Sequence, residues 1–209
     1  MRQFLRIILD QVCSRRRRLR KGNSVLLTFD DGPHPDITPI VLDRLRAYNA
    51  RAVFFVVGNR IPKAPDLLPK ILAAGHVLGN HSFSHWLDRE PGPVDYYRDL
   101  MRCQAELNEL TGYVPSLYRA PLGRSTLSSL VIPRLIGLRQ VLWSQDEKDW
   151  MLRTSDAATA VGQQLASKVG PGDIVLLHDD NPWVVNVLDV LLPHLKQLNL
   201  DLNLAVDTL

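Results

Sequence analysis

The sequence predicts an α/β fold built around a mostly parallel sheet. Three observations support this prediction: short apolar runs recur along the chain, segments with helical periodicity separate them, and neither an internal repeat nor a linker-like stretch follows residue 24. Parallel strands need a crossover connection, usually a helix, so this alternation is typical of a parallel sheet. Periodicity leaves open whether the sheet closes into a barrel. At 209 residues the chain is long enough for one such domain.

The strands are predicted from short runs of apolar and β-branched residues bounded by polar or glycine-containing segments. The first run ends just before Asp30 and the sixth just before His178, so charged side chains follow directly on buried strands. The seven runs are residues 25–29, 52–57, 76–79, 116–118, 140–143, 173–177 and 200–206.

The helices are predicted from apolar residues that recur every three to four positions and so share one face. Gly75 and Gly112 follow the second and third of these segments, as expected where a helix ends. Pro133 is expected to interrupt the fourth, because proline removes a backbone donor. The segments are residues 37–45, 67–72, 94–110, 125–130 with a short piece after 133, 156–169 and 183–198.

The charge distribution argues against a general nucleic-acid-binding surface. Lys and Arg total 25 against 22 Asp and Glu, but Arg15–Arg18, Arg20 and Lys21 supply six of the basic residues. Removing these six leaves 19 basic residues against 22 acidic ones. We therefore expect residues 1–23 to form a basic lead-in, disordered or interfacial, and residues 24–209 to form the domain. The lead-in is interpreted as a solvated arm, or as a weak contact with a membrane surface or cell-wall polymer.

The two cysteines, Cys13 and Cys103, have no metal or redox spacing, which excludes a disulfide-dense scaffold. Residues 4–12 are apolar only in part, since Arg6 and Asp10 interrupt them, so a cleaved signal peptide is not expected. No apolar run reaches the roughly 20 residues that a membrane span requires. These features favour a location in the cytoplasm or at the membrane periphery, and we expect the chain to be a monomer.

Reactive side chains follow five of the predicted strands at their C-terminal ends. In parallel α/β proteins the loops at this edge of the sheet build the functional site. The sequence therefore predicts that side chains from distant parts of the chain meet there. The five clusters are Asp30–His34, Asn80–His85, Arg119–Gly123, Asp146 with Asp149 and Trp150, and His178–Asp180.

His81 and His85 are four residues apart, so on one helical turn both imidazoles would face the same side. Two histidines and one carboxylate form a common ligand set for a catalytic divalent metal with open positions. An HxxxH pair alone is more often two surface or capping histidines. The Asp30-Asp31 turn at the end of a neighbouring strand makes a metal site the better explanation.

This combination resembles the polysaccharide deacetylases that share the NodB homology domain, carbohydrate esterase family 4. The resemblance covers about residues 24 to 206 and rests on five motifs in the family's order. One departure is Leu122, where many members carry an aromatic residue. The resemblance implies the family's distorted (β/α)7 barrel. The motifs are TFDDGP at 28–33, HSFSH at 81–85, RAPLG at 119–123, DEKDW at 146–150 and VLLHD at 175–179.

The resemblance also implies roles for individual residues. Asp31, His81 and His85 would bind one divalent metal, usually zinc. Asp30 would be the general base that takes a proton from the attacking water, and Arg119 would pair with Asp30 to keep it oriented and ionised.

The remaining roles concern the oxyanion, the leaving group and the acetyl group. The backbone N–H of Leu122 would stabilise the oxyanion together with the metal. His178 would protonate the leaving amine or alcohol, with Asp149 orienting its imidazole. Trp150 and Leu176 would line a slot for the acetyl methyl, although core packing explains both residues nearly as well.

The predicted function is removal of acetyl groups from an acetylated glycan, either an N-acetylglucosamine-containing oligo- or polysaccharide or an O-acetylated sugar. One alternative with the same fold is a C–N hydrolase of a small cyclic amide or imide, but such relatives often lose part of the metal set that this chain keeps. Another is a catalytically dead glycan-binding protein, which a missing Asp30 or His178 would have favoured. Asp179 and Asp180 either tune His178 or are solvated.

Overall fold

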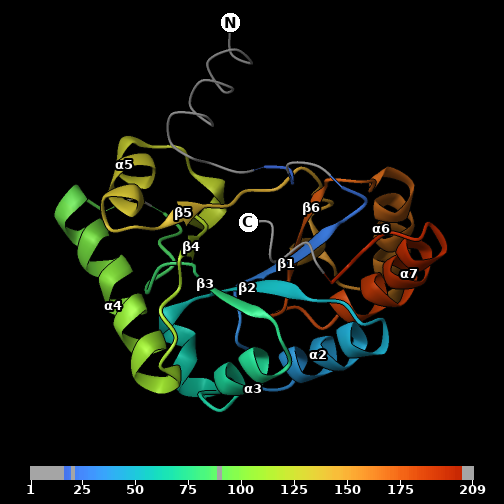
Figure 1. Cartoon of the computed structure of the whole chain (residues 1–209), viewed down its shortest axis with the longest axis horizontal. Coiled ribbons are helices and arrows are strands. Elements are labelled where there is room, and N and C mark those ends of the chain that lie inside the picture. Colours follow the sequence, from blue (N-terminus) through green and yellow to red (C-terminus); the bar gives the residue numbers. More distant parts are fainter. Residues whose placement is uncertain (1–16, 20–21, 89–90, 204–209) are drawn as a thin grey trace, which may run out of the picture.

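The computed structural model describes residues 17–19, 22–88 and 91–203. Six parallel strands form one curled sheet in the order β5-β4-β3-β2-β1-β6, which confirms the predicted α/β class (Figure 1). The strand ends that carry the predicted reactive residues therefore lie along one edge. The strands are β1 (Leu26–Asp30), β2 (Ala52–Val56), β3 (Val77–Asn80), β4 (Leu117–Tyr118), β5 (Arg139–Gln140) and β6 (Ile174–His178).

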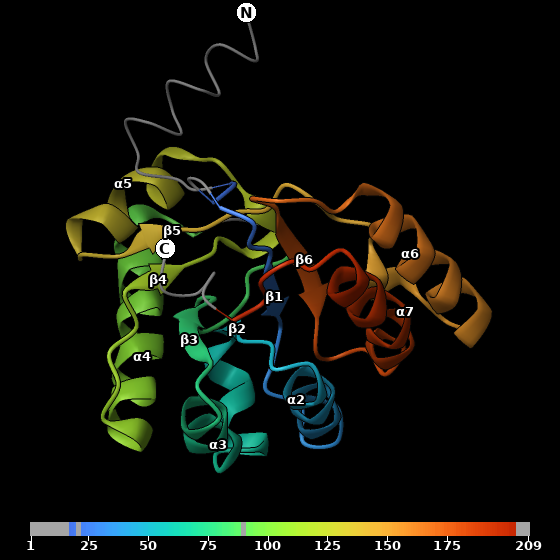
Figure 2. The same cartoon turned by 45° about the vertical axis from the view of Figure 1, so that its right-hand side comes forward.

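Helices cover the outer face of the sheet in an arc, as Figures 1 and 2 show. Neighbouring helices in this arc pack in the order α5, α4, α3, α2, α7 and α6. Three short 3₁₀ helices in the connections have no counterpart in the predicted elements. The α-helices are α2 (Ile37–Ala47), α3 (Leu67–Ala73), α4 (Pro93–Thr111), α5 (Leu127–Leu135), α6 (Ser155–Lys168) and α7 (Val184–Gln197), and the 3₁₀ helices are η1 (Gly58–Lys63), η2 (Pro121–Gly123) and η3 (Asp149–Met151).

The segment after β5 carries the sheet towards closure. The N–H of Gln145 donates to the Ile174 carbonyl at 3.2 Å, and the N–H of Leu176 donates to the Gln145 carbonyl at 3.0 Å. One edge of the described sheet thus contacts the other through an isolated parallel bridge rather than a full strand pair. The described residues thus form a curled half-barrel of the α/β class that the family resemblance implies, with six strands in place of seven.

Successive side chains of β1 point to opposite faces of the sheet, and this alternation decides which of them face the inside of the barrel. Leu27 and Phe29 pack into the main core beneath the helices, whereas Leu26 packs into a smaller cluster with residues of β2, β4 and β6. Thr28 and Asp30 share the side of β1 that Leu26 occupies. The carboxylate at the end of β1 therefore points into the barrel.

Two element predictions differ from the structure. Helix α5 continues through Pro133 instead of stopping, because Pro133 lies in the last turn, where a distortion displaces only the two helical residues that follow it. The expected strand over residues 200–206 contributes a single parallel bridge between Asp201 and Ser24, while residues 204–206 lie outside the described part of the chain.

Part of the predicted lead-in packs against the domain. The N–H of Leu19 donates to the Gly172 carbonyl at 2.8 Å, and the Leu19 side chain is buried in the smaller apolar cluster that also contains Leu26. Arg18 pairs with the Asp173 carboxylate at 2.7 Å. Residues 1–16, 20 and 21, which include Arg15, Arg16, Arg20 and Lys21 of the basic run, lie outside the described residues.

Across residues 17–19, 22–88 and 91–203, no helix is both long and apolar enough to cross a membrane.

Candidate active site

Asp30 and Asp31 diverge where β1 ends. Asp30 is the last residue of the strand and is buried, whereas Asp31 takes a left-handed conformation with φ of 74°. Gly32 then passes so close to the Asp179 carboxylate that a Cβ atom there would collide with it. The turn therefore places two adjacent carboxylates in different positions, one inside the barrel and one beside the β3 loop.

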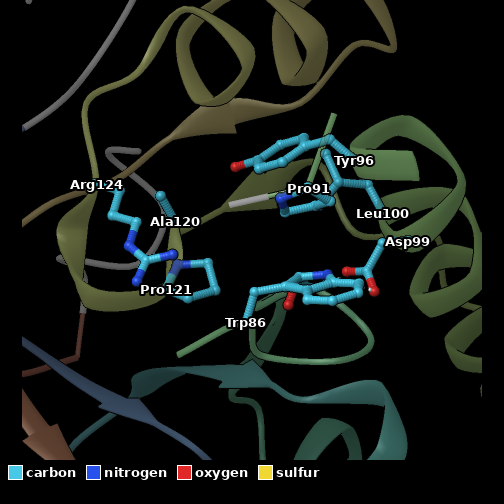
Figure 3. Close-up of a pocket in the computed structure, with 9 residues that line it drawn as sticks. Trp86, Pro91, Tyr96, Asp99, Leu100, Ala120, Pro121 and Arg124 are labelled. Carbon is cyan, nitrogen blue, oxygen red and sulfur yellow. Dashed lines mark hydrogen bonds between the residues drawn. The ribbon is translucent and has the colours of Figure 1, made fainter. Parts of the chain in front are cut away.

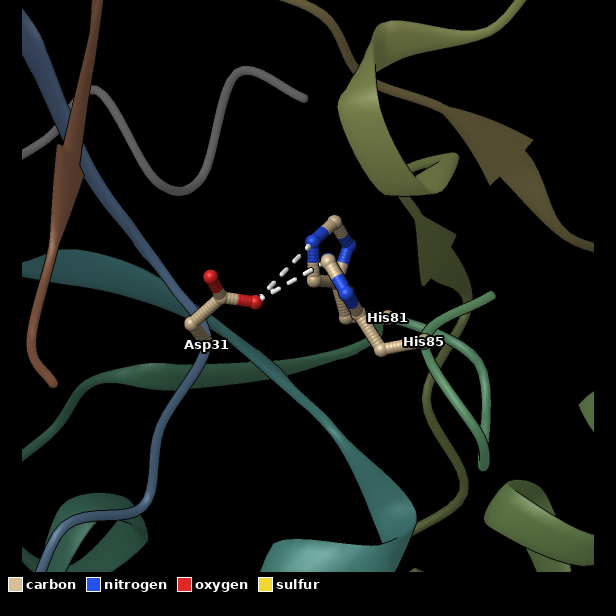
Figure 4. Close-up of side chains that lie close together, drawn as sticks. All are labelled: Asp31, His81 and His85. Carbon is tan, nitrogen blue, oxygen red and sulfur yellow. Dashed lines mark ion pairs between the residues drawn. The ribbon is translucent and has the colours of Figure 1, made fainter. Parts of the chain in front are cut away.

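His81 and His85 lie on a loop after β3, so the expectation of a helical turn is wrong. Ser82 and His85 have positive φ angles of 66° and 45°, which a helix does not allow. Local hydrogen bonds favour this loop: the Asn80 Oδ1 accepts from the N–H of Ser82 at 2.8 Å, and the Ser82 Oγ accepts from the N–H of His85 at 2.9 Å. Both imidazoles still reach Asp31, with Nε2 to Oδ1 distances of 3.7 Å for His81 and 3.1 Å for His85 (Figure 4).

The chemistry of these three side chains fits a divalent cation. One ligand atom from each of Asp31, His81 and His85 lies within 4.8 Å of the others, and the buried Asp31 Oδ1 has no hydrogen-bond partner. The Nδ1 of His81 lies 2.9 Å from the Arg119 carbonyl, a contact that needs a proton on Nδ1 and leaves the Nε2 lone pair facing Asp31. Burial lowers the pKa of His81 to about 3, although the charge of Asp31 opposes this effect, so the ring is neutral.

A buried arginine anchors Asp30. The Nη1 of Arg119 donates to the Asp30 Oδ1 at 2.7 Å, and the second carboxylate oxygen lies 3.5 Å from the His81 Nε2. Arg119 is fully buried and also donates to the Thr28 Oγ1 and the Val141 carbonyl. Burial raises the pKa of Asp30, while the Arg119 guanidinium opposes this shift. One oxygen of Asp30 is thus held, and the other faces the histidine cluster.

Asp149 holds His178 at two points. Its Oδ1 lies 2.7 Å from the His178 Nδ1, and its Oδ2 accepts from the His178 backbone N–H at 2.8 Å. Burial lowers the pKa of His178, but the hydrogen bond and charge of Asp149, with the charges of Asp30 and Asp31, raise it to about 9. His178 lies opposite Asp30 in the β1–β6 register, so an anchored carboxylate and a cationic imidazole stand on adjacent strand ends.

A cavity of about 440 Å³ joins these groups. Arg119 and Asp149 are not among its lining residues, but each contacts one that is. The residue predicted to supply the oxyanion N–H, Leu122, is 60% exposed with a φ of 58°. The cavity is lined by Asp30, Asp31, His81, His85, Leu87, Leu122, Trp143, Asp146, Lys148, Trp150, Leu176 and His178.

A family model described as polysaccharide deacetylase matches residues 17–141, more than half of the chain. The chain belongs to the polysaccharide deacetylase family. Members of this family generally depend on a metal, in line with the Asp31, His81 and His85 cluster.

Individual members of the polysaccharide deacetylase family are similar over most of this chain. A chitooligosaccharide deacetylase of Azorhizobium caulinodans is 35% identical over 164 residues, which cover 77% of this chain and 75% of that protein. A peptidoglycan-N-acetylglucosamine deacetylase of Listeria monocytogenes is 33% identical over 177 residues, 85% of this chain but 37% of that longer protein. The crystal structure of a peptidoglycan N-acetylglucosamine deacetylase superposes with a TM-score of 0.82 at 30% identity, covering 90% of this chain and 88% of that one.

Three polar residues around the candidate site make contacts that were not predicted from the sequence. Arg60 of η1 donates to the Asp31 carbonyl and pairs with Asp180 at 2.7 Å. Asp179 is fully buried against the Asp31–Gly32 turn and accepts from the Thr38 hydroxyl at 2.5 Å, so it is not solvated. These contacts join segments far apart in sequence, and no local pattern indicates them.

Proposed function

We propose that this chain is a metal-dependent deacetylase of glycans that contain N-acetylglucosamine. The observation that carries the proposal is the pair of anchored groups beside the candidate metal cluster. Asp30 is fixed by Arg119 and His178 by Asp149, and both line the cavity that Asp31 also lines. A base and an acid in one cavity are what amide hydrolysis needs, because water must lose a proton and the leaving nitrogen must gain one.

The proposed cofactor is Zn²⁺, held by Asp31, His81 and His85. Two imidazoles and one carboxylate suit zinc, and a three-residue set leaves coordination positions open. When bound, such a metal polarises the acetyl carbonyl and lowers the pKa of a coordinated water.

In the proposed reaction, the free oxygen of Asp30 accepts a proton as a water molecule attacks the acetyl carbonyl carbon. Arg119 keeps Asp30 oriented during this step, and the backbone N–H of Leu122 donates to the developing oxyanion. His178 then gives its Nε2 proton to the amide nitrogen while the C–N bond breaks. The products are acetate and the free amino sugar.

A second cavity supports an oligosaccharide substrate. It measures about 480 Å³ and shares Asp31, His85, Leu87 and Trp150 with the first cavity. Trp150 is 50% exposed between them, and aromatic side chains offer an apolar face to sugar rings. An acetylated sugar in the first cavity would therefore leave room for a neighbouring sugar in the second.

The proposal is tested by measuring acetate release from acetylated chitooligosaccharides and peptidoglycan fragments, with and without a chelator. Acetate release that stops on chelation and returns with Zn²⁺ is the expected result. Hydrolysis of a cyclic imide in place of both glycans would favour the alternative C–N hydrolase. Binding of the glycan without acetate release would favour a catalytically dead protein.

The metal site itself is tested by element analysis of the purified protein. We expect one divalent ion per chain in the wild type and loss of that ion in the His81→Ala/His85→Ala double variant, because a single carboxylate remains. His194→Ala on α7 is the matched control, since it removes a histidine outside the cluster. A full equivalent of metal in the double variant would exclude this ligand set.

The alkaline limit of activity is expected to depend on Asp149. His178 must be protonated to act as the acid, and the negative charges of Asp149, Asp30 and Asp31 all favour its protonated form. Asp149→Asn removes one charge and lowers the His178 pKa, so the alkaline limb of the rate–pH profile should move to lower pH. Metal content should stay unchanged. Asp156→Asn, which changes an exposed aspartate at the start of α6, is the control. If the alkaline limb of the rate–pH profile stayed in place in Asp149→Asn, the role given to Asp149 would be contradicted.

A further inference from the structure

The loop that carries His85 is held from outside by a carboxylate on α4. The Asp99 Oδ2 accepts from the backbone N–H of Phe83 at 2.8 Å, and the Oδ1 accepts from the backbone N–H of Ser84 at 3.0 Å. The Oδ1 also lies 3.3 Å from the indole Nε1 of Trp86. Both oxygens of one side chain thus bind the loop, and Asp99 is only 9% exposed.

These contacts lie on both sides of His85 in the chain. Ser84 precedes His85 and Trp86 follows it, and Figure 3 shows the Asp99 carboxylate beside the Trp86 indole. A carboxylate that accepts several N–H groups in a buried place makes charge-assisted hydrogen bonds, which are stronger than neutral ones. Asp99 of α4 therefore fixes the backbone just before His85, at Phe83 and Ser84, and holds the side chain of the residue just after it.

His85 needs such support because its own conformation is unfavourable. A positive φ, here 45°, is uncommon for a residue other than glycine and persists only where surrounding contacts impose it. The Ser82 hydroxyl supplies one contact within the loop. The N–H groups of Gly58 and Asn59 on η1 donate to the Ser82 and Phe83 carbonyls, and Asp99 adds the side-chain contacts that tie the loop to α4.

We propose that Asp99 is a positioning residue that holds His85 in the geometry required for metal binding. The inference rests on the proposed metal site, but it adds a residue that lies outside the five motifs and lines neither of the two cavities assigned to the glycan. Groups that orient a metal ligand typically contribute 10–100-fold to metal affinity. Asp99 acts through the loop and touches neither the ligand atoms nor the cavity assigned to the acetyl group.

The test is the affinity of Asp99→Asn for Zn²⁺, measured by competition with a chromophoric chelator. An asparagine has the same shape but offers an N–H₂ group where one loop N–H needs an acceptor. We expect metal binding to weaken by about 10–100-fold. The matched control is Asp95→Asn, an exposed aspartate one turn earlier on the same helix, which should bind Zn²⁺ like the wild type.

Co²⁺ substitution separates positioning from general stability. The visible absorption of bound Co²⁺ reports its coordination geometry, so Asp99→Asn should shift or weaken these bands while Asp95→Asn leaves them unchanged. Trp86→Phe removes the indole donor, leaves the two backbone contacts of Asp99 in place and should weaken binding less, in the same direction. If Asp99→Asn does not fold, Trp86→Phe shows whether the contacts of Asp99 affect the metal site.

Zinc affinity and a cobalt spectrum that stay unchanged in Asp99→Asn would overturn the inference, even if its melting temperature fell. If Asp99→Asn does not fold, the same unchanged values in Trp86→Phe would overturn it. These measurements need no turnover, so they remain informative if the glycan assignment fails. Absence of metal binding in the wild type would instead refute the proposed metal site.

Discussion

Replacing Asp30 by asparagine is expected to abolish most deacetylation while leaving the metal in place. The side-chain amide of this variant cannot take a proton from water, and general-base steps typically contribute about 10²–10⁴-fold to the rate. Metal binding should survive, because the ligand set proposed here uses Asp31, His81 and His85. Turnover of N-acetylated chitooligosaccharides and metal content, measured on the same preparation, test the prediction.

The main complication is the buried charge of Arg119. It now pairs with Asp30, and removing one partner of a buried ion pair typically costs about 3–5 kcal/mol of stability. Kinetics should therefore be measured well below the melting temperature of the variant, with Asp43→Asn on α2 as an exposed control. Near-normal acetate release from a folded, metal-loaded Asp30→Asn protein would show that Asp30 is not the base.

The α/β class could be predicted from sequence because its signals are local. Buried strands such as β1 and β6 are continuous apolar runs, and amphipathic helices such as α4 carry an apolar stripe. The short edge strands were harder, since β5 pairs only Arg139 and Gln140 where four residues were expected. The 3₁₀ helices were missed because three to six residues carry no periodicity.

The site could be predicted only where residues form motifs at strand ends. Asp30, His81, Arg119 and His178 belong to such motifs, and the structure gathers them around one cavity or directly beside it. The geometry between motifs could not be predicted, as the HxxxH loop shows, because side-chain hydrogen bonds replaced the helical turn. Asp99 lies within an ordinary helical pattern, and only the tertiary fold shows its contacts with the loop.

His178→Ala is expected to slow hydrolysis of an N-acetyl substrate by roughly 10²–10⁴-fold, the usual contribution of a general acid. An amine leaves with difficulty unless its nitrogen is protonated as the C–N bond breaks. His178 is the group placed to supply that proton, since Asp149 holds its Nδ1 and the ring lines the cavity. The measurement is kcat for acetate release from chitooligosaccharides at saturating metal.

The same variant should lose much less activity on an activated aryl acetate, because a phenolate leaves without being protonated. This difference separates acid catalysis from a structural effect, which would slow both substrates alike. The backbone N–H of residue 178 still donates to Asp149, so part of the anchoring contact survives the change. Metal content and melting temperature show whether the site stays intact. Equal losses on both substrates would mean that His178 serves binding or structure, and that another group protonates the leaving nitrogen.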